Sequence, residues 1–144
     1  MRYYLDLADS GNWLVKSPGG RLTCDTEKEE TQHLVDMLNE LNENPNGKSL
    51  PTETEIEDTL QKLQDRLEEK AMSLSANAAV KEGYEESVDI LADDRRTYAG
   101  IDKLKTTQGR VIAVLAVDYL NGECTAEVLL GVPLKEVIGS RLKR

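Results

Sequence analysis

The stretch "VIAVLAVDYLNGECTAEVLLGVP", residues 111–133, decides the fold, because it is the most apolar part of the chain and supports two different structures. Asn121-Gly122 between two apolar runs is a strong β-hairpin signal, since a type I′ turn needs positive φ at both central positions. The competing interpretation is a single helix that starts at Thr106 and is capped by Gly122, with valine and isoleucine on all its sides.

Folding the stretch at Asn121-Gly122 gives one uniformly apolar face, from Tyr119 opposite Cys124 down to Val111 opposite Val132. A shift of one residue would mix the two faces, and the many β-branched residues favour strands. The sequence therefore predicts strands over residues 96–132 with a hairpin at 121–122. The pattern leaves open whether residues 95–109 are strand or loop.

The N-terminal part of the chain alternates between apolar and polar residues and is interrupted by turn residues. "YYLDLAD" and "WLVKS" are separated by Asp9-Ser10-Gly11-Asn12, and "SPGG" precedes "RLTC". This pattern predicts a β-meander over residues 3–24, followed by a helix over residues 26–43. Together with the hairpin, it predicts a single α+β domain over residues 1–144, in which one antiparallel sheet contains the N-terminal meander and the C-terminal hairpin and packs with an acidic helical middle segment.

Residues 52–92 have the pattern of that acidic helical segment. Thr52 and Glu55 form a capping pair at its start, and Gly83 lowers the helical signal enough to suggest a kink or a break. A heptad-like leucine spacing fits either a helical hairpin inside the domain or the seam of a homodimer. The candidate seam residues are Leu60, Leu63 and Leu67.

The charge of the chain is concentrated in its middle. The net charge is −9, whereas residues 25–94 carry six basic and twenty acidic groups, and residues 95–144 carry nine basic and five acidic groups. The acidic surface either keeps the protein solvated, or docks on a basic partner or imitates nucleic acid. The candidate partner-binding residues are Glu55, Asp58, Asp65, Glu68, Glu69, Glu82, Glu85 and Glu86.

Motifs for catalysis, cofactor binding or metal binding are missing from the sequence. His33 is the only histidine, and no zinc, EF-hand or phosphate-loop spacing occurs. Cys24 and Cys124 are expected as free thiols in a reducing cytoplasm. The N-terminus does not resemble a signal peptide, and no apolar run is long enough to cross a membrane, so we expect a cytoplasmic protein without membrane contact.

The C-terminal segment "LLGVPLKEVIGSRLKR", residues 129–144, resembles the second half of the helix-turn-helix of sigma-factor-type regulators, over about 15 of 144 residues. Those regulators often read Leu-Gly-Val-Pro before a basic recognition helix that ends in Ser-Arg-Leu. The resemblance implies DNA contact through a basic terminal helix, which the sequence places at residues 133–143. The acidic net charge disfavours nucleic acid as a partner.

These observations favour a small acidic protein that binds or regulates another protein without catalysis and that forms a homo-oligomer. An inhibitor or an adaptor fits this description, including a phage-encoded one that blocks a nucleic-acid-handling machine of its host. The alternative is a DNA-binding transcriptional regulator that uses the basic C-terminal helix. A third hypothesis is an enzyme whose site forms only in three dimensions, around His33 or a cysteine.

Overall fold

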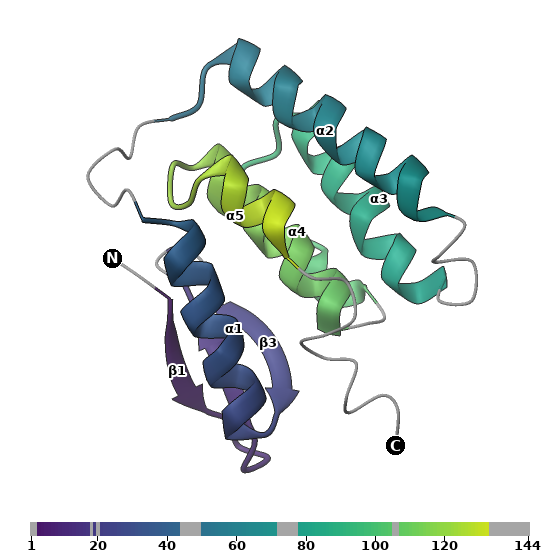
Figure 1. Ribbon diagram of the computed structural model, residues 1–144. Coiled ribbons are helices and arrows are strands. Elements are labelled where there is room, and N and C mark those ends of the chain that lie inside the picture. Colours follow the sequence, from purple (N-terminus) through teal and green to yellow (C-terminus); the bar gives the residue numbers. More distant parts are fainter. Residues whose placement is uncertain are drawn as a thin grey trace.

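The protein has an α+β fold with a small sheet at one end and a helical layer at the other (Figure 1). The computed structural model describes residues 3–17, 19, 21–43, 50–71, 78–104 and 107–132. The elements, in chain order, are β1 (Tyr4–Leu7), β2 (Trp13–Lys16), β3 (Arg21–Thr26), α1 (Lys28–Leu41), α2 (Glu53–Ala71), α3 (Ala78–Ala92), the short 3-10 helix η1 (Ile101–Lys103), α4 (Thr107–Leu120) and α5 (Ala126–Gly131).

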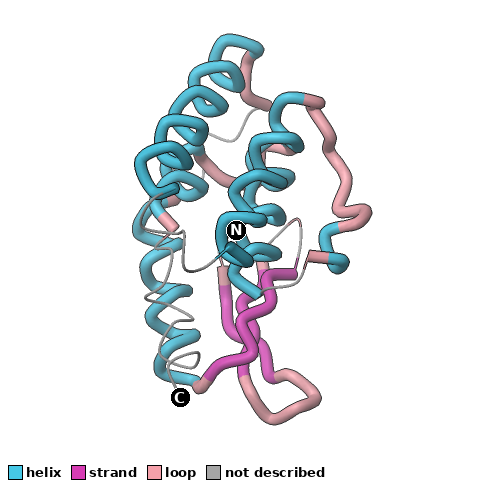
Figure 2. The backbone as a smooth tube through the Cα atoms, turned by 90° about the vertical axis from the view of Figure 1, so that its right-hand side faces the viewer, coloured by secondary structure: helices cyan, strands magenta, loops and turns pink. Residues whose placement is uncertain are grey.

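The N-terminal strands form the predicted β-meander. The sheet has the order β1-β2-β3, and both pairs are antiparallel. Helix α1 packs on the sheet, and Asn39 on α1 exchanges two hydrogen bonds with the backbone of Tyr3, at 2.9 and 3.1 Å. Figure 2 shows the sheet beside a helix at one end of the molecule, with the turn between β1 and β2 at the far end. The alternation and the turn residues were therefore sufficient to predict this part of the fold.

The predicted C-terminal hairpin is wrong, because residues 107–120 form helix α4 and residues 126–131 form helix α5. Gly122 has φ +76° and its N–H donates to the carbonyl oxygen of Tyr119 at 3.1 Å, while the N–H of Glu123 donates to that of Asp118 at 2.8 Å. This pair of bonds is a Schellman motif, which caps a helix at its C-terminus. The positive φ that suggested a hairpin turn thus ends a helix, as in the competing interpretation.

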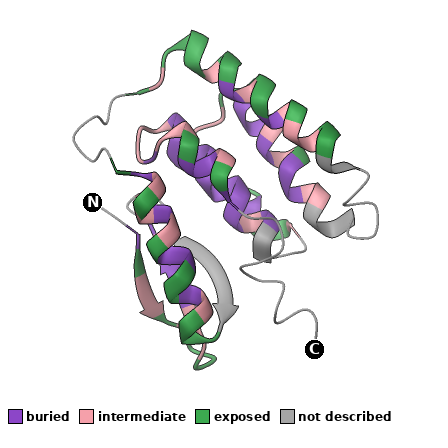
Figure 3. Cartoon of the chain, in the orientation of Figure 1, coloured by how far each residue is buried: buried purple, intermediate pink, exposed green. Residues whose placement is uncertain are grey.

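Helix α4 lacks a polar face because it is buried on all sides. Every residue from Val111 to Leu120 is buried (Figure 3), and α4 packs against α3, α5 and β3.

The strands predicted over residues 96–132 are wrong. Residues 96–100 form an irregular segment with a bend and a turn that leads into η1, and α4 and α5 follow. The predicted terminal helix over residues 133–143 lies outside the described residues.

The acidic segment predicted over residues 52–92 consists of two packed helices, α2 and α3. The predicted break at Gly83 does not occur, because α3 continues through it, and the alternative of a kink there stays a prediction. Gly83 faces Gly109 of α4 so closely that an added Cβ would lie 2.3 Å from the Cα of Gly109. Glycine is therefore present to let two helix backbones approach each other rather than to interrupt a helix.

The buried core joins the two ends of the molecule. Side chains from α1 and β2, including Leu38 and Val15, share one apolar cluster with Leu63 of α2 and Tyr84 of α3. Helix α4 runs through the centre of this cluster. Among the described residues, we find no helix with the length and apolar character needed to span a membrane.

Candidate functional site

Helix α2 is fixed at its N-terminus by the predicted capping box. The N–H of Thr52 donates to Oε1 of Glu55 at 2.9 Å, and the N–H of Glu55 donates to Oγ1 of Thr52 at 3.2 Å. Each bond satisfies an amide group that the first turn of a helix leaves without an intrahelical partner. The first turn of α2, which carries two of its carboxylates, is therefore held in a defined orientation.

The leucine stripe of α2 packs inside the chain. Leu63 is 0% exposed, and Leu60 and Leu67 are partly buried against the same core. This packing is what the helical-hairpin alternative predicts, and the side chain of Leu63 leaves no exposed surface for a second copy. The heptad-like spacing arises because α2 packs on α3 along a narrow apolar stripe.

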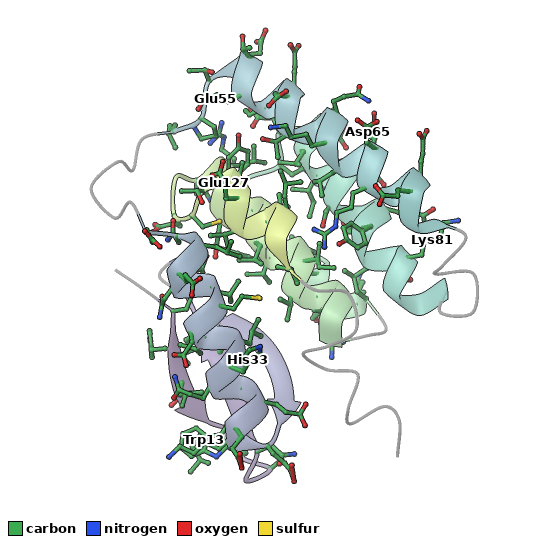
Figure 4. The ribbon with its side chains drawn as sticks, viewed as in Figure 1. Trp13, His33, Glu55, Asp65, Lys81 and Glu127 are labelled. Atoms are coloured by element: carbon green, nitrogen blue, oxygen red, sulfur yellow. The ribbon has the colours of Figure 1, made fainter. Side chains whose placement is uncertain are left out.

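The outer side of α2 carries a row of exposed carboxylates, which we call the acidic face. Figure 4 shows Asp65 on the side of α2 that is turned away from α4 and α5. Five of the eight predicted partner-binding residues belong to this face. The acidic face consists of Glu53, Glu55, Glu57, Asp58, Asp65, Glu68 and Glu69.

The described cations of α2 leave most of this negative charge uncompensated. Lys62 pairs with Asp58 at 3.1 Å. Arg66 turns inward instead: its guanidinium donates to the carbonyl oxygens of Leu130 and Val132 and lies 5.1 Å from the centroid of the Tyr84 ring. Arg66 therefore joins α2 to the end of α5 and contributes little to neutralising the acidic face.

The other three predicted partner-binding residues lie on α3 and are more strongly engaged with the chain itself. Glu86 is half-buried and forms an ion pair with Arg95, while Glu85 is exposed and lies 3.9 Å from Lys81. Glu82 is half-buried. The structure thus brings the α2 residues together on one exposed side and places the α3 residues on a different, partly neutralised helix.

A groove opens where the start of α2 meets the end of α3, with a volume of about 510 Å³. Its floor is apolar and its rim carries three carboxylates and one guanidinium. That guanidinium, from Arg96, lies 3.1 Å from Asp94 and also donates to the carbonyl oxygen of Leu120. The lining residues are Pro51, Glu53, Ile56, Glu57, Leu60, Leu91, Ala92, Asp94 and Arg96.

Sequence reasoning missed this groove, because its two sides come from distant parts of the chain. Asp94 is positioned by a second Schellman motif: it has φ +53°, and the N–H of Arg95 donates to the carbonyl oxygen of Ile90 at 3.0 Å. One local signal was available, since Glu53 and Glu57 form a row beside Ile56 and Leu60 on α2. Residues four apart share one side of a helix.

A second group of polar side chains is buried around Asp118. Ser17 donates its hydroxyl to Oδ2 of Asp118 at 2.7 Å, and the Tyr98 hydroxyl donates to Oδ1. Asp118 is 0% exposed, and Gly19 lies so close that an added Cβ would be 2.8 Å from Oδ1. The carboxyl group thereby links the end of β2 and the segment before η1 to α4.

Burial sets the ionisation of this group. Loss of hydration raises the pKa of Asp118 to about 6, although the hydrogen bonds from Tyr98 and Ser17 act in the opposite direction, and the charge of Glu123 raises it further. Burial of Tyr98, together with its hydrogen bond to Asp118, raises the pKa of that phenol. The sequence held one signal for this group, since Asp118 is the only charged residue between Val111 and Leu120, and a buried charge needs partners.

The residues considered for catalysis do not assemble into a site in the described part of the chain. His33 is exposed on α1, and Cys124 is buried, with Sγ 3.6 Å from the carbonyl oxygen of Leu115. The side chain of Cys24 lies outside the described residues. Within the residues that the structure describes, no three or more histidine, cysteine or acidic side chains are grouped in a way that could hold a metal ion.

No protein-family model, no curated protein and no solved structure matches this chain.

Proposed function

We propose that this protein is a non-catalytic binding protein that docks a basic protein partner on the acidic face of α2, as an inhibitor or adaptor would. The observation that carries the proposal is where the cationic side chains of α2 that the structure describes are directed. Arg66 is directed into the interior and Lys62 is paired with Asp58, so exposed carboxylates dominate the outer side of this helix. Such a surface attracts an excess of lysine and arginine on a partner.

The strength of this interaction depends on several carboxylates acting together. An exposed ion pair contributes only about 0.2–1 kcal/mol, because water and salt screen it. Three such pairs would contribute about 1.5 kcal/mol, which corresponds to roughly a tenfold change in affinity. The interaction is therefore expected to be fast, salt-sensitive and dependent on the number of charges on α2.

Neutralising three residues of the acidic face is expected to weaken partner capture about tenfold. The variant is Asp65→Asn, Glu68→Gln, Glu69→Gln, which removes three exposed negative charges from one side of α2. The tagged full chain is used to capture proteins from a lysate of the source organism at moderate ionic strength. Quantitative mass spectrometry then compares the proteins retained by the variant with those retained by the wild type.

The matched control carries the same change in net charge on another helix. Glu29→Gln, Asp36→Asn, Glu40→Gln removes three exposed charges from α1 and is expected to retain the wild-type partner. That partner should itself have a cluster of lysine and arginine. Equal retention by all three proteins would contradict the proposal, and so would an equal loss in both variants, because neither result depends on α2.

A further inference from the structure

We infer that the groove between the start of α2 and the end of α3 binds one amphipathic α-helix of the partner, with its apolar side on the floor and its basic side on the α2 rim. This inference rests on the proposed function and deepens it, because it names the site and the structural class of the partner segment. The apolar floor, the charge of the rim and the arrangement of both along α2 carry it.

The floor of the groove is an unpartnered apolar surface. Ile56 and Leu60 are each only partly buried although they belong to the core-facing stripe of α2, and the buried side chain of Leu91 on α3 lines the same groove. A groove of about 510 Å³ that is open to solvent leaves Ile56 and Leu60 without full cover. An apolar surface that runs along two packed helices is suited to accept a third helix.

The rim supplies the charge that selects the partner. Glu53 and Glu57 are exposed, and no ion pair is found for either within the described part of the chain. Across the groove, Arg96 compensates Asp94 at 3.1 Å. The charge left for a partner is therefore that of the two glutamates, which is complementary to lysine or arginine.

The apolar residues and the carboxylates of α2 that line the groove form two rows, and the spacing within these rows fits a helical partner segment better than an extended one. Ile56 and Leu60 are four residues apart, and so are Glu53 and Glu57, so an apolar row and an acidic row run side by side along α2. A helix with apolar residues at i and i+4 and basic residues in the adjacent row presents the matching pattern. A second copy of this chain fits less well, because its net charge of −9 would be repelled.

The test uses the full chain and two labelled peptides of equal composition. One peptide of about 18 residues, long enough to form a helix, contains leucine, alanine and lysine with the leucines along one side. The other has the same residues in scrambled order. We expect the amphipathic peptide to bind at least about tenfold more tightly in a fluorescence-anisotropy titration, because only it can place an apolar row on the floor.

Three variants localise the binding. Glu57→Lys is expected to weaken binding of the amphipathic peptide about tenfold, whereas Glu40→Lys on α1 makes the same change in charge and is expected to alter it less than about twofold. Both positions are exposed on helices, so both variants should fold, which circular dichroism checks. Ile56→Ala, which removes part of the floor, is expected to weaken binding several-fold.

Each alternative outcome overturns the inference in a recognisable way. Equal binding of both peptides, or equal effects of Glu57→Lys and Glu40→Lys, would show nonspecific attraction, while the capture experiment with the α2 triple variant would still decide the proposed function. No binding of either peptide would also remove the groove as a helix site. Sedimentation of the wild type as a dimer that Glu57→Lys dissociates would assign the groove to a second copy instead.

Discussion

Gly83→Ala is expected to lower the free energy of unfolding by about 3 kcal/mol, although alanine is the better helix former. The added Cβ would lie 2.3 Å from Cα of Gly109 and 3.1 Å from the carbonyl carbon and oxygen of that residue. Carbon atoms in favourable contact are about 3.5–4.0 Å apart. Because the obstacle is backbone and not a rotatable side chain, α3 and α4 must separate.

Two opposing effects meet at this position, which makes the sign of the result informative. Replacing glycine by alanine inside a helix usually stabilises it by about 1 kcal/mol. Separating α3 from α4 costs more, because it disturbs the packing of buried neighbours such as Tyr84 and Ile112. The measurement is urea-induced unfolding followed by circular dichroism, and a variant as stable as the wild type would contradict the close crossing.

Gly131→Ala is the matched control. An added Cβ there would lie 2.6 Å from Cδ1 of Leu41, so it also meets an atom at short distance within a helix. The obstacle is the end of a flexible side chain, which can change its rotamer. We therefore expect a loss of less than about 1 kcal/mol, and the difference between the two variants isolates the contribution of backbone contact.

The parts of the fold that were predicted from the sequence are those with a clear local pattern of apolar, polar and capping residues. The meander alternates, and α2 has a capping box and a single leucine stripe, so local patterns carried the information. Residues 111–120 lack such a pattern because α4 is buried all round, and periodicity then says nothing about the element type. Asn121-Gly122 satisfied the rules for a hairpin and for a helix cap equally well.

The candidate site was predictable to a similar extent. The exposed carboxylates of α2 followed from charge and periodicity, since an amphipathic helix turns its polar side outward. The groove between α2 and α3 could not be predicted from the sequence, because Leu91 and Arg96 come to lie beside the α2 residues only when α3 packs on α2. The inward turn of Arg66 was equally hidden, since it depends on the carbonyl groups at the end of α5.

Asp118→Asn is expected to remove a pH dependence of stability worth about 3 kcal/mol. Burial raises the pKa of Asp118 from the ordinary value of 3.8 to about 6 in the folded protein. The folded protein thus binds this proton more tightly than the unfolded chain does. The stability that the group contributes is fully present below pH 3.8 and is lost as the pH rises through about 6.

The measurement compares the wild type with the variant at about pH 4 and about pH 7.5, the range over which the group changes its charge. The free energy of unfolding of each protein depends on many other acidic groups, but their effects cancel in the difference between the two. That difference is expected to shift by about 2.5 kcal/mol in favour of the variant at the higher pH, because pH 4 already lies just above the unfolded-state pKa of 3.8. Asp89→Asn, an exposed change on α3, should shift it by about 0.5 kcal/mol or less.

The direction of this shift separates two roles for the buried carboxyl group. If the hydroxyl groups of Ser17 and Tyr98 stabilised the ionised form more than burial opposes it, the wild type would gain stability with rising pH relative to the variant. Burial is the larger influence, because Asp118 is fully enclosed and Glu123 adds a second negative charge nearby. A difference that stays constant between the two pH values, or that grows in favour of the wild type, would show that Ser17 and Tyr98 compensate the burial completely.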